Sequence, residues 1–145
     1  MSEEPIALTD IESVLGIKIS AAALPEIGER RIRIVFPSGA KMTIVISDEG
    51  KWQNAASFTS ADGGALNEFI AVLHGSMEVA TPGKGGVPKF AHYGRGSVAT
   101  IDARQTHATH LAEGSCVVGI MSSDWQGVTR TGDPDFDAKI QVTEM

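Results

Sequence analysis

The sequence has little that is typical of a protein that binds nucleic acids or spans a membrane. Its 12 Lys and Arg stand against 18 Asp and Glu, a net charge of −6 that argues against a nucleic-acid partner. The only basic cluster, RRIR at 30–33, alternates with apolar residues, so we expect a solvated strand face there. No apolar run is long enough to cross a bilayer, and the acidic start MSEEP does not resemble a signal peptide. We therefore expect a cytoplasmic protein without a membrane partner.

Two further signatures are missing. The single cysteine, Cys116, cannot form an intramolecular disulfide, and its place in the apolar run SCVVGIM predicts an inert thiol on a strand. The glycine-rich stretches GKGG at 83–86 and GRG at 94–96 lack the spacing of Walker or Rossmann phosphate loops. We interpret both as tight β turns.

The apolar residues that are present mostly follow a period of two. RIRIVF at 31–36 and KMTIVIS at 41–47 predict two strands, joined by PSGA at 37–40 as a hairpin loop. The run EFIAVLHGSMEVA at 68–80 is interpreted as another hairpin around His-Gly-Ser, and further short alternating runs follow. Only TDIESVL at 9–15 has the period of a helix. Evenly spaced short strands predict an all-β sandwich or closed barrel.

The domain organisation predicted from this pattern is a single domain over residues 1–145. We expect its barrel core at about 30–122, with an N-terminal segment, 1–28, and a C-terminal tail, 123–145, at the periphery. AKIQV at 138–142 is interpreted as a last edge strand, which would offer an edge for pairing in a homodimer.

Two spacings resemble the sequence motifs of the cupin superfamily, which read G-x5-H-x-H-x3,4-E-x6-G and G-x5-P-x-G-x2-H-x3-N. Glu68 is followed by six residues and then Gly75, as in the end of the first motif. Ten residues separate Gly96 from His107, as the glycine and histidine of the second motif require. Glu68 therefore matches the glutamate of the family and His107 its last histidine.

This resemblance covers residues 30 to 122, and the block 67–79 is similar to small cupins of the acetylacetone-cleaving dioxygenase type. It implies a small jelly-roll β-barrel with an open mouth, which holds a metal between three histidines and a glutamate. It also implies that Glu68 points into the barrel. Small cupins are commonly dimers, so the resemblance favours a homodimer.

The first motif departs from the family at its histidines. Five residues after Gly50 the sequence has Ala56 and then Phe58 where the family has two histidines, and nine residues separate Phe58 from Glu68. Position 111, the asparagine of the second motif, is Leu111. The matching positions thus supply two metal ligands, whereas catalytic metals normally keep about three protein ligands.

The other histidines do not complete the ligand set in regular strands. His110 lies an odd number of residues from His107 and is expected to face the opposite side. His74 shares the face of Glu68 but lies roughly 20 Å along the strand. The direction of His92 is open. We therefore expect no tightly bound metal, with a divalent Fe, Zn, Mn or Ni ion held by Glu68 and His107 as the alternative.

Without a metal, Glu68 and His107 would remain as an acid–base pair, since a histidine beside a carboxylate passes protons in either direction near neutral pH. Trp52, Asn54 and Phe58 share one strand face if that segment is regular, and they are candidate substrate-binding residues. Ala56 and Phe58 make this side of the barrel more apolar, which suits a small organic ligand.

Three functions are compatible with these residues. The favoured one is an isomerase, cyclase or lyase that does acid–base chemistry on a small organic substrate without a tightly bound metal. The alternatives are a metal-dependent cupin oxygenase with an altered ligand set, and a non-catalytic ligand-sensing or binding module. Fold alone does not separate them.

Overall fold

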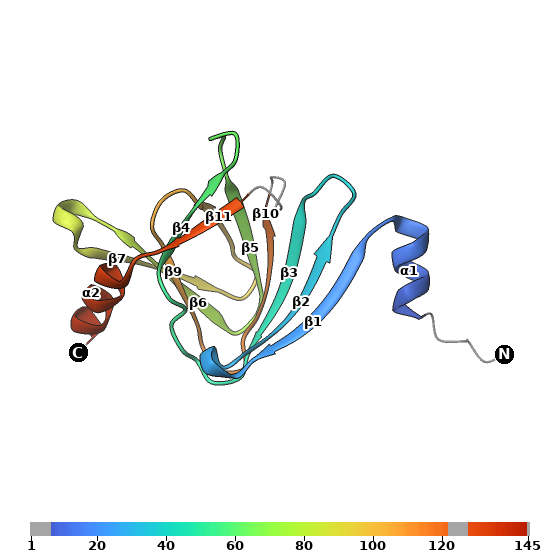
Figure 1. Cartoon of the computed structure of the whole chain (residues 1–145). Helices are drawn as coiled ribbons and strands as arrows, with labels where there is room; N and C mark the ends of the chain where they lie inside the picture. The colour runs from blue at the N-terminus through green and yellow to red at the C-terminus, as the bar shows by residue number, and fades with distance from the viewer. Residues whose placement is uncertain (1–6, 122–127, 145) are drawn as a thin grey trace.

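The fold consists mostly of β-strands (Figure 1). The computed structural model describes residues 7–121 and 128–144. Its strands are β1 (Lys18–Leu24), β2 (Glu29–Val35), β3 (Lys41–Ser47), β4 (Ala56–Ser60), β5 (Asn67–His74), β6 (Ser76–Pro82), β7 (Pro88–Gly94), β8 (Val98–Asp102), β9 (Ala108–Leu111), β10 (Cys116–Met121) and β11 (Val128–Gly132). Its helices are α1 (Leu8–Leu15) and α2 (Pro134–Glu144), with short 3-10 turns η1 (Pro25–Ile27) and η2 (Lys84–Gly86).

The strands form two opposing walls of a barrel. One wall is a six-stranded sheet in the order β1-β2-β3-β10-β5-β8. The other consists of a three-stranded sheet, β7-β6-β9, and a two-stranded sheet, β11-β4. Two single bridges connect β4 and the segment before it to β9 and the segment before it. One joins Ala56 to His107, and the other joins Trp52 to His110. The predicted all-β jelly-roll barrel is confirmed.

The hydrophobic core fills the space between the two walls. Val45, Ile70 and Val117 point inward from the six-stranded sheet, and Met77 and Leu111 face them from β6 and β9. Each is less than a tenth exposed. The alternation of side chains along each strand puts every second residue into this space, which is why the period of two in the sequence predicted the barrel.

The N-terminal segment contributes one strand to the barrel wall. The predicted helix at 9–15 is confirmed as α1, which lies away from the barrel on the right of Figure 1. β1, at 18–24, pairs with β2 over its whole length and forms the edge of the six-stranded sheet. Residues 18–24 are therefore part of the barrel wall, although the sequence predicted a peripheral extension over 1–28.

The prediction of an edge strand at 138–142 is wrong, because this segment belongs to helix α2. Asp133 caps the helix by accepting a hydrogen bond from the backbone N–H of Phe136 at 3.0 Å, and Pro134 occupies the first helical position. Phe136 and Ile140, four residues apart, are 4% and 2% exposed and pack on Ala80 and its neighbours. One helical turn separates them, so the apolar positions follow a helical period.

The prediction of a hairpin at 68–80 is also wrong. β5 pairs with β8 and β10, whereas β6 pairs with β7 and β9, so the chain crosses from one wall to the other between them. Gly75 makes this crossing with a φ of 79°. A Cβ atom there would collide with Ser115, whose hydroxyl binds the backbone of Ser76. The glycine is needed for both its backbone conformation and this close approach.

The outer face of the six-stranded sheet is apolar and partly exposed. Ile32, Phe69, Val98 and Ile120 are between 39% and 61% exposed on this face. Cys116, at the start of β10, is half-buried with a free thiol. Among the described helices, none is long and apolar enough to cross a membrane.

Candidate functional site

The barrel encloses a cavity of about 470 Å³ between its two walls. Its lining combines apolar core side chains with a small number of polar and charged groups from β2, β3, β5, β9 and the segment before β4. A cavity of this size and composition is typical of a small-molecule site. Glu68 and His107, the two residues that match the cupin motifs, both line it.

Glu68 points into the cavity from β5. Its neighbours across the sheet are Met121 on β10 and Ile101 on β8, both buried on the inner face. Gly119, also on the inner face of β10, leaves room beside the carboxylate: a Cβ atom built there would lie 3.5 Å from Oε1 of Glu68. Burial raises the pKa of Glu68 above its usual value, and the positive charges of His107 and Lys41 oppose this shift only in part.

His107 lies directly before β9 and is 8% exposed. Its backbone N–H and carbonyl both pair with Ala56 at 3.0 Å, which fixes the residue against the segment of β4. The ring atom Nδ1 lies 2.8 Å from the carbonyl oxygen of Gln105. Because a carbonyl only accepts, Nδ1 carries the hydrogen, so Nε2 of the neutral ring has a free lone pair. The ring of Phe58 packs beside it, with 5.8 Å between the ring centroids.

Three cationic side chains line the cavity from β2 and β3: Arg31, Arg33 and Lys41. The sequence predicted a solvated strand face for RRIR at 30–33, and this prediction is wrong for two of its arginines. Arg31 and Arg33 face inward, whereas the apolar Ile32 between them is 39% exposed on the outside. The sequence correctly predicted that charged and apolar residues alternate along this strand. It assigned the charged face to solvent, whereas the structure turns that face toward the cavity.

Arg31 is neutralised within the protein. Oε1 of Glu29, which is 3% exposed, accepts hydrogen bonds from Nε and Nη2 of Arg31 at 2.9 and 2.7 Å. The amide of Gln53 donates to the other carboxylate oxygen at 2.7 Å. This charged pair is therefore hydrogen-bonded on both oxygens of its carboxylate, as a stable buried pair requires.

Arg33 differs from Arg31 because no carboxylate in the described part of the chain forms a salt bridge with it. Nε of Arg33 is buried and has no hydrogen-bond partner among the described residues. Arg33 lies opposite Thr43, two residues along β3 from Lys41, so that the two cations are diagonal neighbours on the inner face. Burial lowers the pKa of Lys41 to about 8, and the charge of Arg33 adds to this effect.

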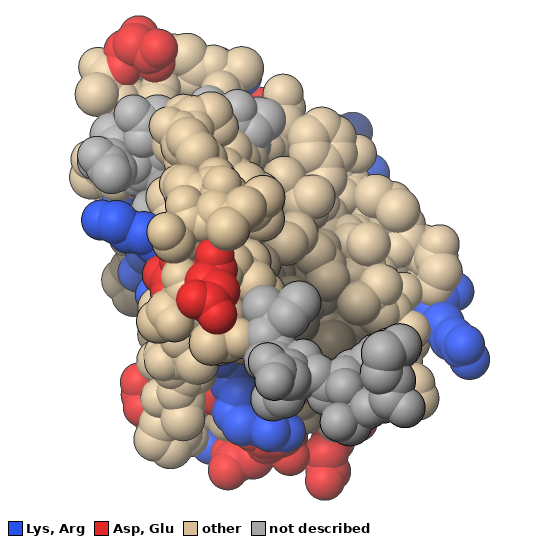
Figure 2. All heavy atoms as spheres, turned by 90° about the vertical axis from the view of Figure 1, so that its right-hand side faces the viewer, with Lys and Arg blue, Asp and Glu red and all other residues tan. Residues whose placement is uncertain are grey.

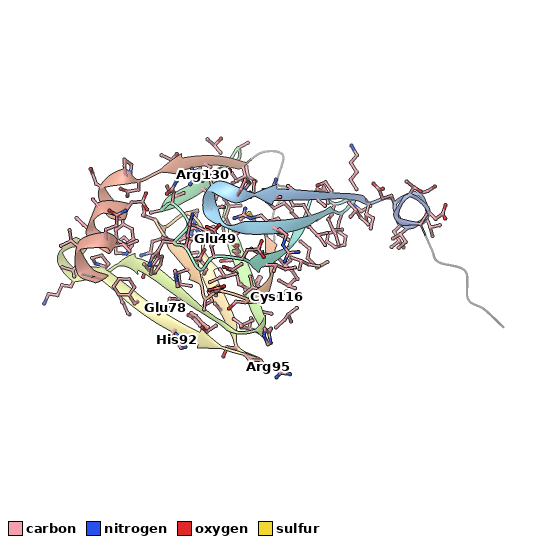
Figure 3. All side chains as sticks on the ribbon, turned by 90° about the horizontal axis from the view of Figure 1, so that it is seen from below. Glu49, Glu78, His92, Arg95, Cys116 and Arg130 are labelled. Atoms are coloured by element: carbon pink, nitrogen blue, oxygen red, sulfur yellow. The ribbon has the colours of Figure 1, made fainter. Side chains whose placement is uncertain are left out.

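Arg130 brings a fourth cation to the cavity, from β11. Its Nη2 donates to the backbone carbonyl of Asn54 at 3.3 Å. In the view of Figure 3 Arg130 lies at one side of the barrel, and Glu78 and His92 lie at the other. On the outer surface shown in Figure 2, charged side chains of both signs are scattered in small groups. Four cationic side chains thus line the cavity of a chain whose net charge is −6.

The residues at the metal positions of the cupin motifs do not fit a metal. Ala56 and Phe58, at the positions of the first two histidines, line the cavity with Glu68 and His107 but bring only a methyl group and an aromatic ring. In the described part of the chain no group of three or more His, Cys, Asp or Glu side chains is placed to hold a metal ion. Two donors with a lysine nearby are a poor site for a divalent cation.

The remaining predicted site residues separate into two groups. Asn54 and Phe58 line the cavity. Trp52 does not: it packs against Phe90 and His110, with ring centroids 5.8 and 5.2 Å away, in the cluster beneath α2. The segment from 51 to 55 is not a regular strand, which is why Trp52 does not share the face of the other two.

The other histidines lie outside the cavity lining. His110 faces away from His107, as expected from its odd spacing, and its Nε2 lies 2.8 Å from the carbonyl oxygen of Gly50. His74 and His92 are exposed. Arg33 and Lys41 were missed as site residues, although the alternation of charged and apolar residues on β2 was the available signal.

Comparisons with known proteins support the fold. No protein-family model and no curated protein matches the sequence. Among solved structures, a deletion mutant of Bacillus subtilis oxalate decarboxylase, a cupin, superposes with a TM-score of 0.63 at 12% identity, over 83% of this chain and 32% of that chain. Peruvianin-I, a cysteine peptidase from Thevetia peruviana latex, superposes with a TM-score of 0.60 at 11% identity, over 78% and 72% of the two chains.

A third similar structure is an HTH_3 family transcriptional regulator from Vibrio cholerae, with a TM-score of 0.52 at 17% identity, over 79% of this chain and 60% of that chain. This chain thus spans about a third of the oxalate decarboxylase that it matches. At these identities the likeness shows the fold alone, a cupin-like barrel.

Proposed function

We propose that the protein is an enzyme that transfers protons on a small organic substrate bound in the barrel cavity, without a tightly bound metal. The observation that carries this proposal is that Glu68 and His107 line one cavity and interact electrostatically, while the described residues place no third metal ligand beside them. Burial favours the protonated form of Glu68, which makes it the acid. Nε2 of His107 is the base, because the carbonyl of Gln105 fixes the hydrogen on Nδ1.

A carbonyl compound with a hydrogen on the neighbouring carbon fits these two roles. His107 removes the proton from carbon as Glu68 donates its proton to the carbonyl oxygen, and the reverse transfer at a different atom completes an isomerisation. Phe58 and Ile70 give the lining around this pair an apolar part that can hold the carbon skeleton of the substrate. A positioned acid or base of this kind is worth about 10²–10⁴-fold in rate.

The test is exchange of carbon-bound hydrogen with solvent deuterium, followed by NMR over a panel of small aldehydes, ketones and 2-oxo acids. The wild type should exchange at least one compound, and Glu68→Gln and His107→Gln should each slow this by about 10²-fold or more. Glu78→Gln is the matched control, since Glu78 lies on β6 with its neighbours Met77 and Val79 facing inward. Exchange that is unchanged in Glu68→Gln contradicts the proposal.

The ligand-sensing alternative uses the same cavity and predicts binding without exchange. If the wild type binds a panel compound but exchanges none, this alternative replaces the enzyme. The oxygenase alternative is disfavoured because Ala56 and Phe58 cannot donate to a metal.

The homodimer predicted from the sequence is likewise a proposal. The wrongly predicted edge strand no longer supports it, but the apolar outer face of the six-stranded sheet does, since Phe69 and Ile120 are exposed there. Sedimentation of the wild type beside Phe69→Lys tests it: a monomeric wild type contradicts the dimer.

A further inference from the structure

We propose that the protein forms a homodimer in which the β1 strands of two copies pair edge to edge about a two-fold axis. This inference rests on the homodimer proposed above, because it names the surface at which that dimer forms, and it is independent of the enzymatic activity. β1 is the outermost strand of the six-stranded sheet, so that one of its edges pairs with no other described strand (Figure 1). Pairing with a second copy would join two six-stranded sheets into one.

The open edge of β1 presents the backbone groups of Ala21 and Ala23. In an antiparallel pair, alternate residues bond to the neighbouring strand and the residues between them point away from it. Ile19 points away from β2, because its N–H donates to Oε2 of Glu12 at 3.2 Å. Ala21 and Ala23 follow Ile19 at a period of two. Their N–H and C=O groups therefore also point outward, where the described strands supply no partner.

Both ends of this open segment are closed to a pairing strand. The N–H of Ile19 is already bonded within the chain, and Pro25 has no N–H. An antiparallel pair of β1 strands centred on Ala22 uses only the groups between these ends, because Ala21 of each copy exchanges hydrogen bonds with Ala23 of the other. The pattern is self-complementary about a two-fold axis, as an interface between identical patches requires.

The side chains of β1 allow a second strand to approach. From Ser20 to Ala23 the strand has no charged residue and no proline, the usual devices that keep an edge strand from pairing. All residues of this segment are exposed, both those on the cavity side and those on the outer face. At the centre, Ala22 would lie opposite Ala22 of the partner subunit, where two methyl groups fit between Cβ atoms about 5 Å apart.

The charges near the two ends of β1 are complementary in this register. Lys18 stands four residues before Ala22 and Glu26 four residues after it, so pairing about Ala22 brings Lys18 of each copy beside Glu26 of the other. Both side chains are exposed, and neither forms a salt bridge with a described residue. Glu26 also lines the cavity, so the partner's Lys18 would lie where the cavity opens to solvent.

The position of α1 also favours a partner at this edge. Glu12 of α1 reaches the outward N–H of Ile19, so the helix lies on the side of the open edge. Its apolar residues Val14 and Leu15 are 82% and 59% exposed. Antiparallel pairing brings α1 of each copy to the η1 end of the other, which gives these side chains a surface to pack on.

The experiment is sedimentation velocity of the whole protein over a range of concentrations. The wild type should dimerise. Ala22→Lys should weaken the dimer by about fivefold or more, because it sets two like charges opposite each other at the axis. Thr129→Lys is the matched control, since it adds the same charge at an exposed position of β11, and it should dimerise as the wild type does.

Charge reversal tests the register of the pairing. Lys18→Glu and Glu26→Lys should each weaken the dimer, because each sets like charges side by side. The double variant should recover the wild-type dissociation constant, since the two side chains meet only across the axis. Within one chain the length of β1, roughly 20 Å, separates them. A double variant that does not recover overturns the inference.

Failure of this inference is distinguishable from failure of the proposed function. A monomeric wild type overturns the homodimer and its surface together. A dimer that Phe69→Lys disrupts and Ala22→Lys leaves intact overturns the edge and keeps the homodimer, which then forms through the outer face. Unchanged deuterium exchange in Glu68→Gln, with the dimer behaving as expected, overturns the enzyme and keeps the edge. If Ala22→Lys does not fold, the charge-reversal variants decide in its place.

Discussion

Replacing Lys41 by methionine should stabilise the protein at neutral pH. Burial lowers the pKa of Lys41 from 10.5 to about 8, Arg33 and Arg31 strengthen this shift, and Glu68 opposes it. The folded state therefore holds the charged ammonium less favourably than the unfolded chain does. Methionine keeps the length of the side chain and removes the charge.

The size of the effect follows from the pKa difference. One pKa unit corresponds to about 1.4 kcal/mol, which would give about 3 kcal/mol for the full shift of Lys41. Lys41 is only half-buried, so water in the cavity screens part of this energy. We therefore expect Lys41→Met to raise the free energy of unfolding by about 1–2 kcal/mol at pH 7.

The pH dependence gives the sharper test. Between pH 8 and 10.5 the unfolded chain binds more protons at Lys41 than the folded protein does, so wild-type stability rises with pH in this window. Lys41→Met lacks this rise, and its advantage over the wild type should shrink from pH 8 to 10.5. The assay is urea unfolding at a series of pH values, with Lys41→Arg as the control that stays charged throughout. A methionine variant that is less stable than wild type by the same amount at every pH would refute the reasoning.

Three other outcomes are expected. Glu29→Gln should lower the free energy of unfolding by about 2–4 kcal/mol in urea unfolding because it breaks a buried charged pair; the exposed control Asp48→Asn should change it by about 0.5 kcal/mol at most, and equal effects would contradict this. His107→Gln should raise the pKa of Glu68 further in a carboxyl ¹³C NMR titration, because the carboxylate loses a stabilising charge; a lowered pKa would argue against proximity. Ile140→Ala should destabilise by about 2–4 kcal/mol by thermal or urea unfolding, since Ile140 is 2% exposed; a neutral effect would mean that α2 contributes little packing.

The barrel could be predicted from the sequence because strand periodicity is a local property. Alternation at 31–36 and 41–47 identified β2 and β3 and the hairpin loop between them, since a short turn between two alternating runs favours pairing of neighbours. The crossing at Gly75 could not be predicted in the same way, because a turn between two runs does not show whether the runs pair with each other. The pairing of β5 depends on β10, which is distant in the sequence and lies beside β5 where β6 would lie in a hairpin.

The site residues that match motif spacings could be predicted from the sequence. The site residues whose role depends on which strand face is buried could not. The spacings of Glu68 and His107 place both side chains in the cavity, as the cupin resemblance implied. The inward arginines were missed because alternation separates two faces of a strand without saying which one is buried. Charged residues are rarely buried, so RRIR was assigned to solvent. Here Glu29 and the cavity accommodate the arginines, and the apolar Ile32 is left partly exposed.

The absence of histidines at the first-motif positions 56 and 58 and the presence of inward cations can be understood together. A divalent metal in a barrel supplies a concentrated positive charge to which an anionic substrate can bind, and its ligands must be several converging donors. Ala56 and Phe58 cannot supply those donors, but Arg33 and Lys41 bring two positive charges to the same cavity. Side-chain cations hold charge at fixed places on one wall and leave Glu68 free of a metal. Without a metal, burial keeps the pKa of this carboxyl group raised, as the proposed role of proton donor requires, whereas coordination to a metal would hold it ionised.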